Sequence, residues 1–168
     1  MTAITALTVQ NTSGVSDILE IPIKFVVNQI NSCLSDIKVN AIKIGMLHNA
    51  NLVSAVCKTL SENGIIENDQ IKIVLDPVMV AKGGHKLLEY EAIDALKDLI
   101  SKSKPILTPN IPEAEILTGI KIKNLTDMEK AGKEIIKLGA SSVILKGGHM
   151  KTEVMTDLLI EPSKVYPI

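Results

Sequence analysis

One stretch decides the fold: residues 106–115, Ile-Leu-Thr-Pro-Asn-Ile-Pro-Glu-Ala-Glu. A short apolar run stops at Pro109 and a helix restarts beside two carboxylates, which is typical of a corner between a strand and a helix. Asn110 is a good N-cap, and Glu113 follows three residues later, so the pair fits a capping box with Pro112 in the first turn. The spacing alone favours this structural interpretation over a functional one.

Apolar runs and helical patterns alternate on both sides of this corner. Strands are predicted at residues 3–9, 41–44, 71–75, 105–108 and 141–145, and a hairpin at the sheet edge is predicted from 154–160 and 164–168. Helices are predicted at 23–37, 52–60, 88–99, from the corner to Gly119, and after a second capping pattern at 126–129. Strands that alternate with helices predict βαβ units, so the fold class is α/β with a mainly parallel central sheet in one domain over residues 1–168.

Length and composition suit one soluble globular domain. The chain has 168 residues, 46% hydrophobic residues, a net charge of −1, one Phe, two Tyr and no Trp. Without basic stripes or stacking aromatics the composition argues against nucleic-acid binding, and no apolar run approaches the length of a membrane span. Cys33 and Cys57 are isolated in predicted helices and no secretion signal is present, which favours a reducing cytoplasm.

The predicted sheet should gather polar residues at one edge, because parallel strands all end on the same side and open α/β sheets bind ligands there. Carboxylates at Asp76 and Glu113 suit Mg²⁺, and Lys146 beside two glycines suits a phosphate. This combination indicates nucleotide-dependent phosphoryl transfer. The segments expected at this edge, hereafter the rim, are Gln10, Gly45-Met46, Asp76-Pro77, Thr108-Pro109-Asn110 and Lys146-Gly147-Gly148.

Each rim residue also has a structural interpretation. Asp76 before a proline fits a turn, Lys146 fits a solvated charge, and Met46 is more often core filler than the wall of a ligand pocket. Gln10 is harder to explain in this way, because an amide among apolar neighbours needs hydrogen-bond partners, which a heteroaromatic ligand could supply.

Signatures of several other site types are missing. His48, His85 and His149 are scattered without metal-ligand spacing, so they are interpreted as loop residues. The sequence contains neither the Gly-x-x-x-x-Gly-Lys-Ser/Thr loop of P-loop enzymes nor the Gly-x-Ser-x-Gly elbow of α/β-hydrolases.

Five segments, which occur in the family's order and span nearly the whole chain, resemble the hydroxymethylpyrimidine/phosphomethylpyrimidine kinases of thiamine biosynthesis. They are residues 5–12 (Thr-Ala-Leu-Thr-Val-Gln-Asn-Thr), 43–47 (Lys-Ile-Gly-Met-Leu), 74–81 (Val-Leu-Asp-Pro-Val-Met-Val-Ala), 107–115 and 145–149 (Leu-Lys-Gly-Gly-His). The resemblance implies a ribokinase-like, three-layer α/β/α fold. It also implies ATP- and Mg²⁺-dependent phosphorylation of 4-amino-5-hydroxymethyl-2-methylpyrimidine and then of its monophosphate.

The resemblance implies roles on the substrate side of the site. Gln10 matches the amide that recognises the pyrimidine, and Met46 and Val78 match walls of the substrate pocket. Related pyridoxal kinases share the fold, but residues 10–12 and 43–47 are more similar to the pyrimidine branch.

It also implies roles on the phosphate side. Asn110 and Glu113 match an Asn-x-x-Glu motif that is associated with Mg²⁺ and phosphate, with Asp76 nearby as a second candidate ligand of Mg²⁺. Lys146 matches a family lysine that approaches the nucleotide phosphates.

Two segments of the family pattern have no counterpart here. One is an N-terminal strand with an Asp-Ser-x-Gly-Gly-x-Gly segment that helps to bind substrate, and the other is a C-terminal Gly-Thr-Gly-Cys segment that forms the anion hole. The expectation is a central fragment truncated at both ends, without its catalytic segment, whose partners are the small-molecule substrate and a complementing fragment or a second copy in a homodimer. The alternative is an inactive remnant or a binding and assembly module. Uncovered apolar surface on the sheet and the first helix predicts poor solubility or oligomerisation.

Overall fold

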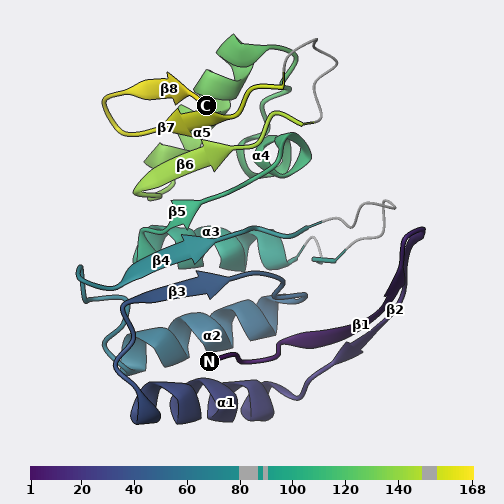
Figure 1. Cartoon of the computed structure of the whole chain (residues 1–168), viewed down its shortest axis with the longest axis vertical. Coiled ribbons are helices and arrows are strands. Elements are labelled where there is room, and N and C mark those ends of the chain that lie inside the picture. Colours follow the sequence, from purple (N-terminus) through teal and green to yellow (C-terminus); the bar gives the residue numbers. More distant parts are fainter. Residues whose placement is uncertain (80–86, 89–90, 149–154) are drawn as a thin grey trace.

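The computed structural model of the protein describes residues 1–79, 87–88, 91–148 and 155–168. Strands β3 to β8 form a six-stranded sheet in chain order, whereas β1 and β2 form a separate two-stranded sheet (Figure 1). Among the described residues, no helix is long and apolar enough to cross a membrane. The elements are β1 (Ala6–Asn11), β2 (Gly14–Glu20), α1 (Ile23–Asp36), β3 (Ala41–Ile44), α2 (Ala50–Glu62), β4 (Lys72–Leu75), α3 (Ala92–Ser103), β5 (Ile106–Leu107), α4 (Ile111–Thr118), α5 (Leu125–Lys137), β6 (Ser142–Leu145), β7 (Leu158–Ile160) and β8 (Val165–Pro167).

Strands β3 to β6 run parallel, with at least one helix in each connection. Leu75 lies opposite Ile44 on one side and Leu107 on the other, and Leu107 lies opposite Val143. The hairpin of β7 and β8 continues the sheet beyond β6 with antiparallel pairing. The mainly parallel α/β fold and the edge hairpin predicted from the sequence are thus confirmed, and the carboxyl ends of β3 to β6 share one edge.

The buried core lies on one face of the six-stranded sheet. Buried side chains of each described helix, α1 to α5, belong to the same hydrophobic cluster as Leu75, Leu107 and Val143 of the strands. The strands cross in front of α3 and α5 in Figure 1. Alternate strand residues point to the opposite face. None of the apolar ones is fully buried: Val74, Ile106, Ile144 and Leu159 are half-buried, and Ala41 and Tyr166 are exposed.

The first predicted strand is present and ends near Gln10–Thr12 as expected, but its predicted burial and its place in the main sheet are wrong. The sequence predicts a buried strand over residues 3–9, but β1 pairs with β2 in the separate hairpin, and Leu7 and Val9 are 50% and 62% exposed. A hairpin turn explains the difference, because the Asn11 side chain accepts hydrogen bonds from the amides of Ser13 (2.8 Å) and Gly14 (3.2 Å). Apolar and β-branched residues indicate a strand, but they do not identify its partner.

Two helix starts also differ from the prediction. Helix α5 is capped by Asn124, whose side chain accepts from the amide of Asp127 (2.9 Å), so the predicted capping pattern at 126–129 lies inside the helix. Helix α3 begins at Ala92, and Leu88 is buried without belonging to it. Asn residues thus supply the N-caps of α4 and α5, as Asn49 does for α2.

Helix α4 ends at Gly119, as the sequence predicts, and this position requires glycine for its backbone conformation alone. Its φ is +73°, and a Cβ added there would meet nothing within 4 Å. We expect Gly119→Ala to lower the free energy of unfolding by about 1 kcal/mol through backbone strain. Gly45→Ala is the matched control, because a Cβ there also meets nothing and φ is not positive. Urea titrations of both variants measure the effect; equal stabilities would contradict the strain argument.

Candidate functional site

The rim is held in register by backbone hydrogen bonds that continue the sheet past the strand ends. The amide of Asp76 donates to the Ile44 carbonyl (2.9 Å), and the amide of Lys146 donates to the Pro109 carbonyl (2.9 Å). Asn110 and Lys146 form an isolated parallel bridge beyond β5 and β6. The predicted convergence is therefore confirmed for the segments that follow these parallel strands.

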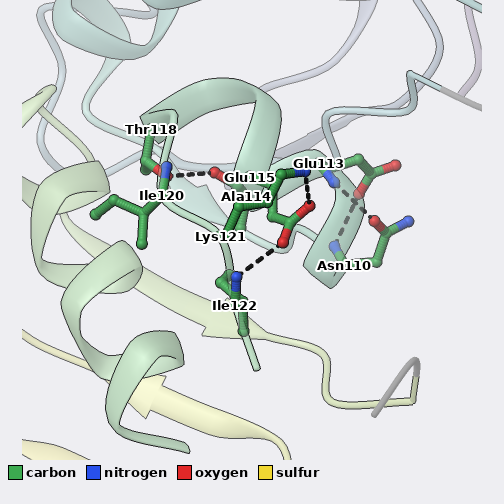
Figure 2. A network of polar contacts seen from close by, with 8 residues as sticks. All are labelled: Asn110, Glu113, Ala114, Glu115, Thr118, Ile120, Lys121 and Ile122. Atoms are coloured by element: carbon green, nitrogen blue, oxygen red, sulfur yellow. Dashed lines mark hydrogen bonds and ion pairs between the residues drawn. The ribbon is translucent and has the colours of Figure 1, made fainter. Parts of the chain in front are cut away.

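The corner between β5 and α4 is closed by a capping box. The Asn110 side chain accepts from the amide of Glu113 (2.9 Å), and the Glu113 carboxylate accepts from the amide of Asn110 (2.8 Å), as Figure 2 shows. Pro112 occupies the first turn of α4, where a backbone N–H would have no helical hydrogen-bond partner, so its missing N–H costs the helix nothing. The capping box expected from the spacing is present, and its carboxylate lies at the rim.

Glu113 is a buried carboxylate, with 3% of its surface exposed. A second contact reaches the amide of Met79, 3.5 Å from Oε1, in the segment that follows β4. Burial raises the pKa of Glu113 above its ordinary value, although the amide of Asn110, the charge of Lys146 and the amide of Met79 act in the opposite direction; the charge of Asp76 adds to the rise. The site thus holds a carboxyl group whose charge costs free energy unless a positive group approaches.

Lys146 forms an ion pair with Asp76, its Nζ lying 3.3 Å from Oδ1. The pair connects the end of β6 with the end of β4 across the short strand β5, and the two side chains are 38% and 22% exposed. A pair this exposed adds at most about 1 kcal/mol to stability. Lys146 is therefore held over the rim by a weak partner that an anionic ligand can replace.

The loop that carries Lys146 packs against the segment before β7. The amide of Gly147 donates to the Asp157 carboxylate (2.8 Å), and a Cβ at Gly147 would lie 2.0 Å from the Thr156 carbonyl oxygen. Asp157 was not identified from the sequence, because one carboxylate before a short strand matches no motif. Its contact fixes the direction in which the chain leaves β6.

The two carboxylates of the 106–115 stretch have different roles, as their positions in Figure 2 show. Glu115 accepts from the amide of Ile122 (2.8 Å) and from Lys121 Nζ (2.9 Å), and these contacts lower its pKa, the Ile122 amide most. Glu115 therefore stabilises the connection from α4 to α5, whereas Glu113 faces the rim.

Gln10 is not at the end of a strand of the main sheet, so its predicted placement is wrong. It lies opposite Val15 beside the hairpin turn, and its side chain is exposed rather than enclosed by apolar neighbours. The hairpin extends from the side of the sheet where β3 to β6 end (Figure 1). Met46 and Val78 follow β3 and β4 and are half-buried, as pocket walls would be.

His48 is a loop residue, as predicted, with φ of +51°. Its ring lies 3.0 Å from the Leu87 carbonyl oxygen and 3.2 Å from a Glu20 carboxylate oxygen. Cys33 and Cys57 lie in α1 and α2 and are free, and burial raises the pKa of Cys57. His85, His149 and the glycines at 83–84 lie outside the described residues.

The donor set at the rim fits Mg²⁺ with few protein ligands. In the described part of the chain, no group of three or more His, Cys, Asp or Glu side chains could hold a metal ion. Asp76 and Glu113 offer hard oxygen atoms, and the charge of Asp76 is felt at Glu113. Mg²⁺ is commonly held by one or two carboxylates while waters and substrate phosphates complete its coordination, and these two residues match that pattern.

The raised pKa of Glu113 predicts how Glu113→Gln depends on pH. Below about pH 4 Glu113 is neutral in both the folded and the unfolded chain. As the pH rises, the unfolded chain loses this proton first, because the pKa of Glu113 is higher in the folded chain, so the free energy of unfolding falls until the folded chain has lost the proton too. The melting temperature of the unchanged chain should therefore exceed that of Glu113→Gln by more at low pH than at pH 8. Glu62→Gln, on an exposed side chain of α2, is the control. A gap that widens toward pH 8 would contradict the direction of the shift.

The packing at Gly147 makes a second prediction. Gly147→Ala should lower the free energy of unfolding by at least about 2 kcal/mol, because its Cβ would overlap the Thr156 carbonyl and the neighbouring backbone must move. Gly148→Ala should change it by less than about 0.5 kcal/mol, because that Cβ meets only the Met155 sulfur, at 3.4 Å. Urea unfolding measures the free energy of unfolding of both variants. Equal losses would show that the close approach of the Thr156 carbonyl does not exclude a side chain at residue 147.

Comparison with known proteins places these features in a family. The model of the family described as phosphomethylpyrimidine kinase matches residues 1–168. The hydroxymethylpyrimidine/phosphomethylpyrimidine kinase of Bacillus subtilis is 41% identical over 97% of this chain. The crystal structure of the Clostridium difficile phosphomethylpyrimidine kinase superposes with a TM-score of 0.86 at 39% identity, covering 99% of this chain and 70% of that one.

Pyridoxal kinases share the fold at lower identity. The structure of an ADP complex of Bacillus subtilis pyridoxal kinase superposes with a TM-score of 0.84 at 31% identity, covering 100% of this chain and 62% of that one. The matched segment spans 59% of the length of the Bacillus subtilis pyrimidine kinase. Because the family model covers all the residues that build the rim, the chain belongs to the phosphomethylpyrimidine kinase family.

Proposed function

We propose that this chain takes part in the ATP-dependent phosphorylation of 4-amino-5-hydroxymethyl-2-methylpyrimidine and of its monophosphate, with Mg²⁺ as the metal ion. The observation that carries the proposal is a buried carboxylate, Glu113, fixed at the rim beside the ion pair of Lys146 and Asp76. Membership of the family, and the fact that a structural neighbour was solved as an ADP complex, support a nucleotide as a substrate.

The capping box of α4 limits the number of backbone amides that could bind a phosphate. Pro112 has no N–H, and the amide of Glu113 already donates to Asn110, so the first turn of α4 keeps few amides for an anion. The phosphate therefore depends on Lys146, which can leave Asp76 and keep its charge close to Glu113.

The Asp76 carboxylate, freed by that movement, and the Glu113 carboxylate would hold the metal. Asp76 and Glu113 would bind Mg²⁺ from the protein side, and the bound ion would neutralise charge on the transferring phosphoryl group. Glu113 is positioned for this by the amides of Asn110 and Met79, which keep its oxygen atoms at the rim. On the substrate side we assign Met46 and Val78 to the pocket wall and Gln10 to pyrimidine recognition from the hairpin.

The direct test is an assay of the purified chain with ATP, Mg²⁺ and hydroxymethylpyrimidine, with product phosphate followed by phosphorus NMR and ADP by a coupled assay. Lys146→Ala should lower the rate about a hundredfold, the usual effect of losing one preorganised donor. Lys130→Ala is the control, because Lys130 pairs with Asp127 on the exposed face of α5. Equal rates for the two variants would contradict the role of Lys146.

Two alternatives give different outcomes in the same experiment. If the chain is an inactive remnant or a binding module, calorimetry would detect binding of ADP or the pyrimidine, and the assay would detect no product. A pyridoxal kinase would phosphorylate pyridoxal in preference to the pyrimidine, and the likeness to a pyridoxal kinase structure makes this the second substrate to assay.

A further inference from the structure

The ring of His48 bridges the β1–β2 hairpin and the body of the domain. Glu20 ends β2 and so belongs to the hairpin that carries Gln10, whereas Leu87 lies between β4 and α3. His48 Nε2 is 3.2 Å from Glu20 Oε1, and its Nδ1 is 3.0 Å from the Leu87 carbonyl oxygen. Only 17% of the His48 side chain is exposed, so the ring is largely enclosed between these two segments.

The backbone that carries the ring is held without the help of the ring. The amide of Asn49 donates to the Leu47 carbonyl (2.6 Å), and the Asn49 side chain caps α2, so both neighbours of His48 are fixed. The hairpin has a second attachment to the body, because the Thr5 hydroxyl donates to the Met46 carbonyl (2.7 Å). Loss of the ring contacts would therefore change the orientation of the hairpin while leaving it attached.

Polar contacts continue from the ring to the rim. The amide of Leu87 donates to the Met79 carbonyl (2.8 Å), and the amide of Met79 lies 3.5 Å from Glu113 Oε1. A path of polar contacts thus runs from Glu20 through the His48 ring and two backbone segments to Glu113. It connects the hairpin with the buried carboxylate of the rim.

The bridge needs hydrogen on both nitrogens of the His48 ring. The Leu87 carbonyl and an ionised Glu20 carboxylate are both acceptors, and a neutral imidazole has a single N–H. The two contacts act in series, so the loss of either proton separates the hairpin from the segment that follows β4. Glu20 is the one charged residue, apart from the ring itself, among the described residues that line the cavity of about 250 Å³ beside it.

We propose that His48 is a positioning residue whose doubly protonated ring holds the hairpin, and with it Gln10, in one orientation relative to Glu113. This role rests on the proposed function, in which the hairpin recognises the pyrimidine and the rim holds the metal ion. Phosphoryl transfer requires a fixed distance between those two groups, and the bridge supplies it. Histidine changes its charge between about pH 5 and 8, so the bridge is complete at the acidic end of this range and broken at the other.

NMR of the chain without ligand tests the bridge itself. At about pH 5.5, Glu20→Gln should shift the backbone amide resonances of Leu87 and Met79, and at about pH 8.5 these shifts should be lost. Asp17→Asn is the matched control, because this carboxylate lies on the same strand and accepts from the amide of Ile18 instead. Shifts of equal size at both pH values, or equal shifts from the two variants, would overturn the proposal.

Two substitutions of the ring separate its contacts. The amide nitrogen of an asparagine can take the place of Nδ1, and that of a glutamine can take the place of Nε2, but neither side chain can span both acceptors. His48→Asn and His48→Gln should therefore both abolish the response of Leu87 and Met79 to Glu20→Gln. A response that survives in either variant would show that the signal does not pass through the ring and would overturn the proposal.

Calorimetry with 4-amino-5-hydroxymethyl-2-methylpyrimidine tests the consequence for binding. At about pH 5.5 both His48 variants should bind the pyrimidine at least about fivefold more weakly than the unchanged chain, and at about pH 8.5 the difference should disappear. Comparison at one pH cancels any ionisation of the pyrimidine. Equal affinities at about pH 5.5 would overturn the positioning role. Absence of binding by the unchanged chain would instead count against the proposed function, and the NMR response would still decide whether the ring forms the bridge.

Discussion

A buried carboxylate can be kept only where amides or positive charges surround it, and this constraint organises the site. Glu113 meets the amides of Asn110 and Met79, which lie after β5 and β4 respectively. Its capping box therefore does more than start a helix, because it ties the ends of two neighbouring strands to one side chain. The ion pair between Lys146 and Asp76 adds the end of β6 to the same cluster. The capping box expected from the Asn-x-x-Glu spacing thus places the carboxylate of the proposed site at the rim.

The parts of the fold that local sequence determines were predictable. Strands β3, β4 and β6 and the edge hairpin carry their own apolar patterns and turn residues, and the capping box at Asn110 needs only residues within one turn. What was not predictable depends on which segments come into contact, which the apolar patterns and the known motifs do not specify. The partner of β1 and the exposure of Gln10 follow from a hairpin turn at Asn11, whose sequence also fits the end of a strand. The contact between Asp157 and Gly147 joins segments ten residues apart, and residues 149–154 between them lie outside the described residues.

The rim also shows why a residue type does not reveal a role. Glu113 and Glu115 are two positions apart in one helix, yet burial raises the pKa of the first while amide and lysine contacts lower that of the second. The helix turns them to different sides (Figure 2), and only one of those sides faces the ends of the parallel strands. Position on the sheet selects which carboxylate can contact a cation at this edge.

The backbone on both sides of Lys146 is fixed while its side chain is not. The amide of Lys146 is bound to the Pro109 carbonyl and that of Gly147 to the Asp157 carboxylate, whereas the ammonium group is held only by a partly exposed pair. A change at this position therefore proceeds by rotation about side-chain bonds, which takes picoseconds to nanoseconds, rather than by loop rearrangement on slower timescales. The ammonium group can therefore change its position while the backbone that carries it keeps its hydrogen bonds to the neighbouring segments.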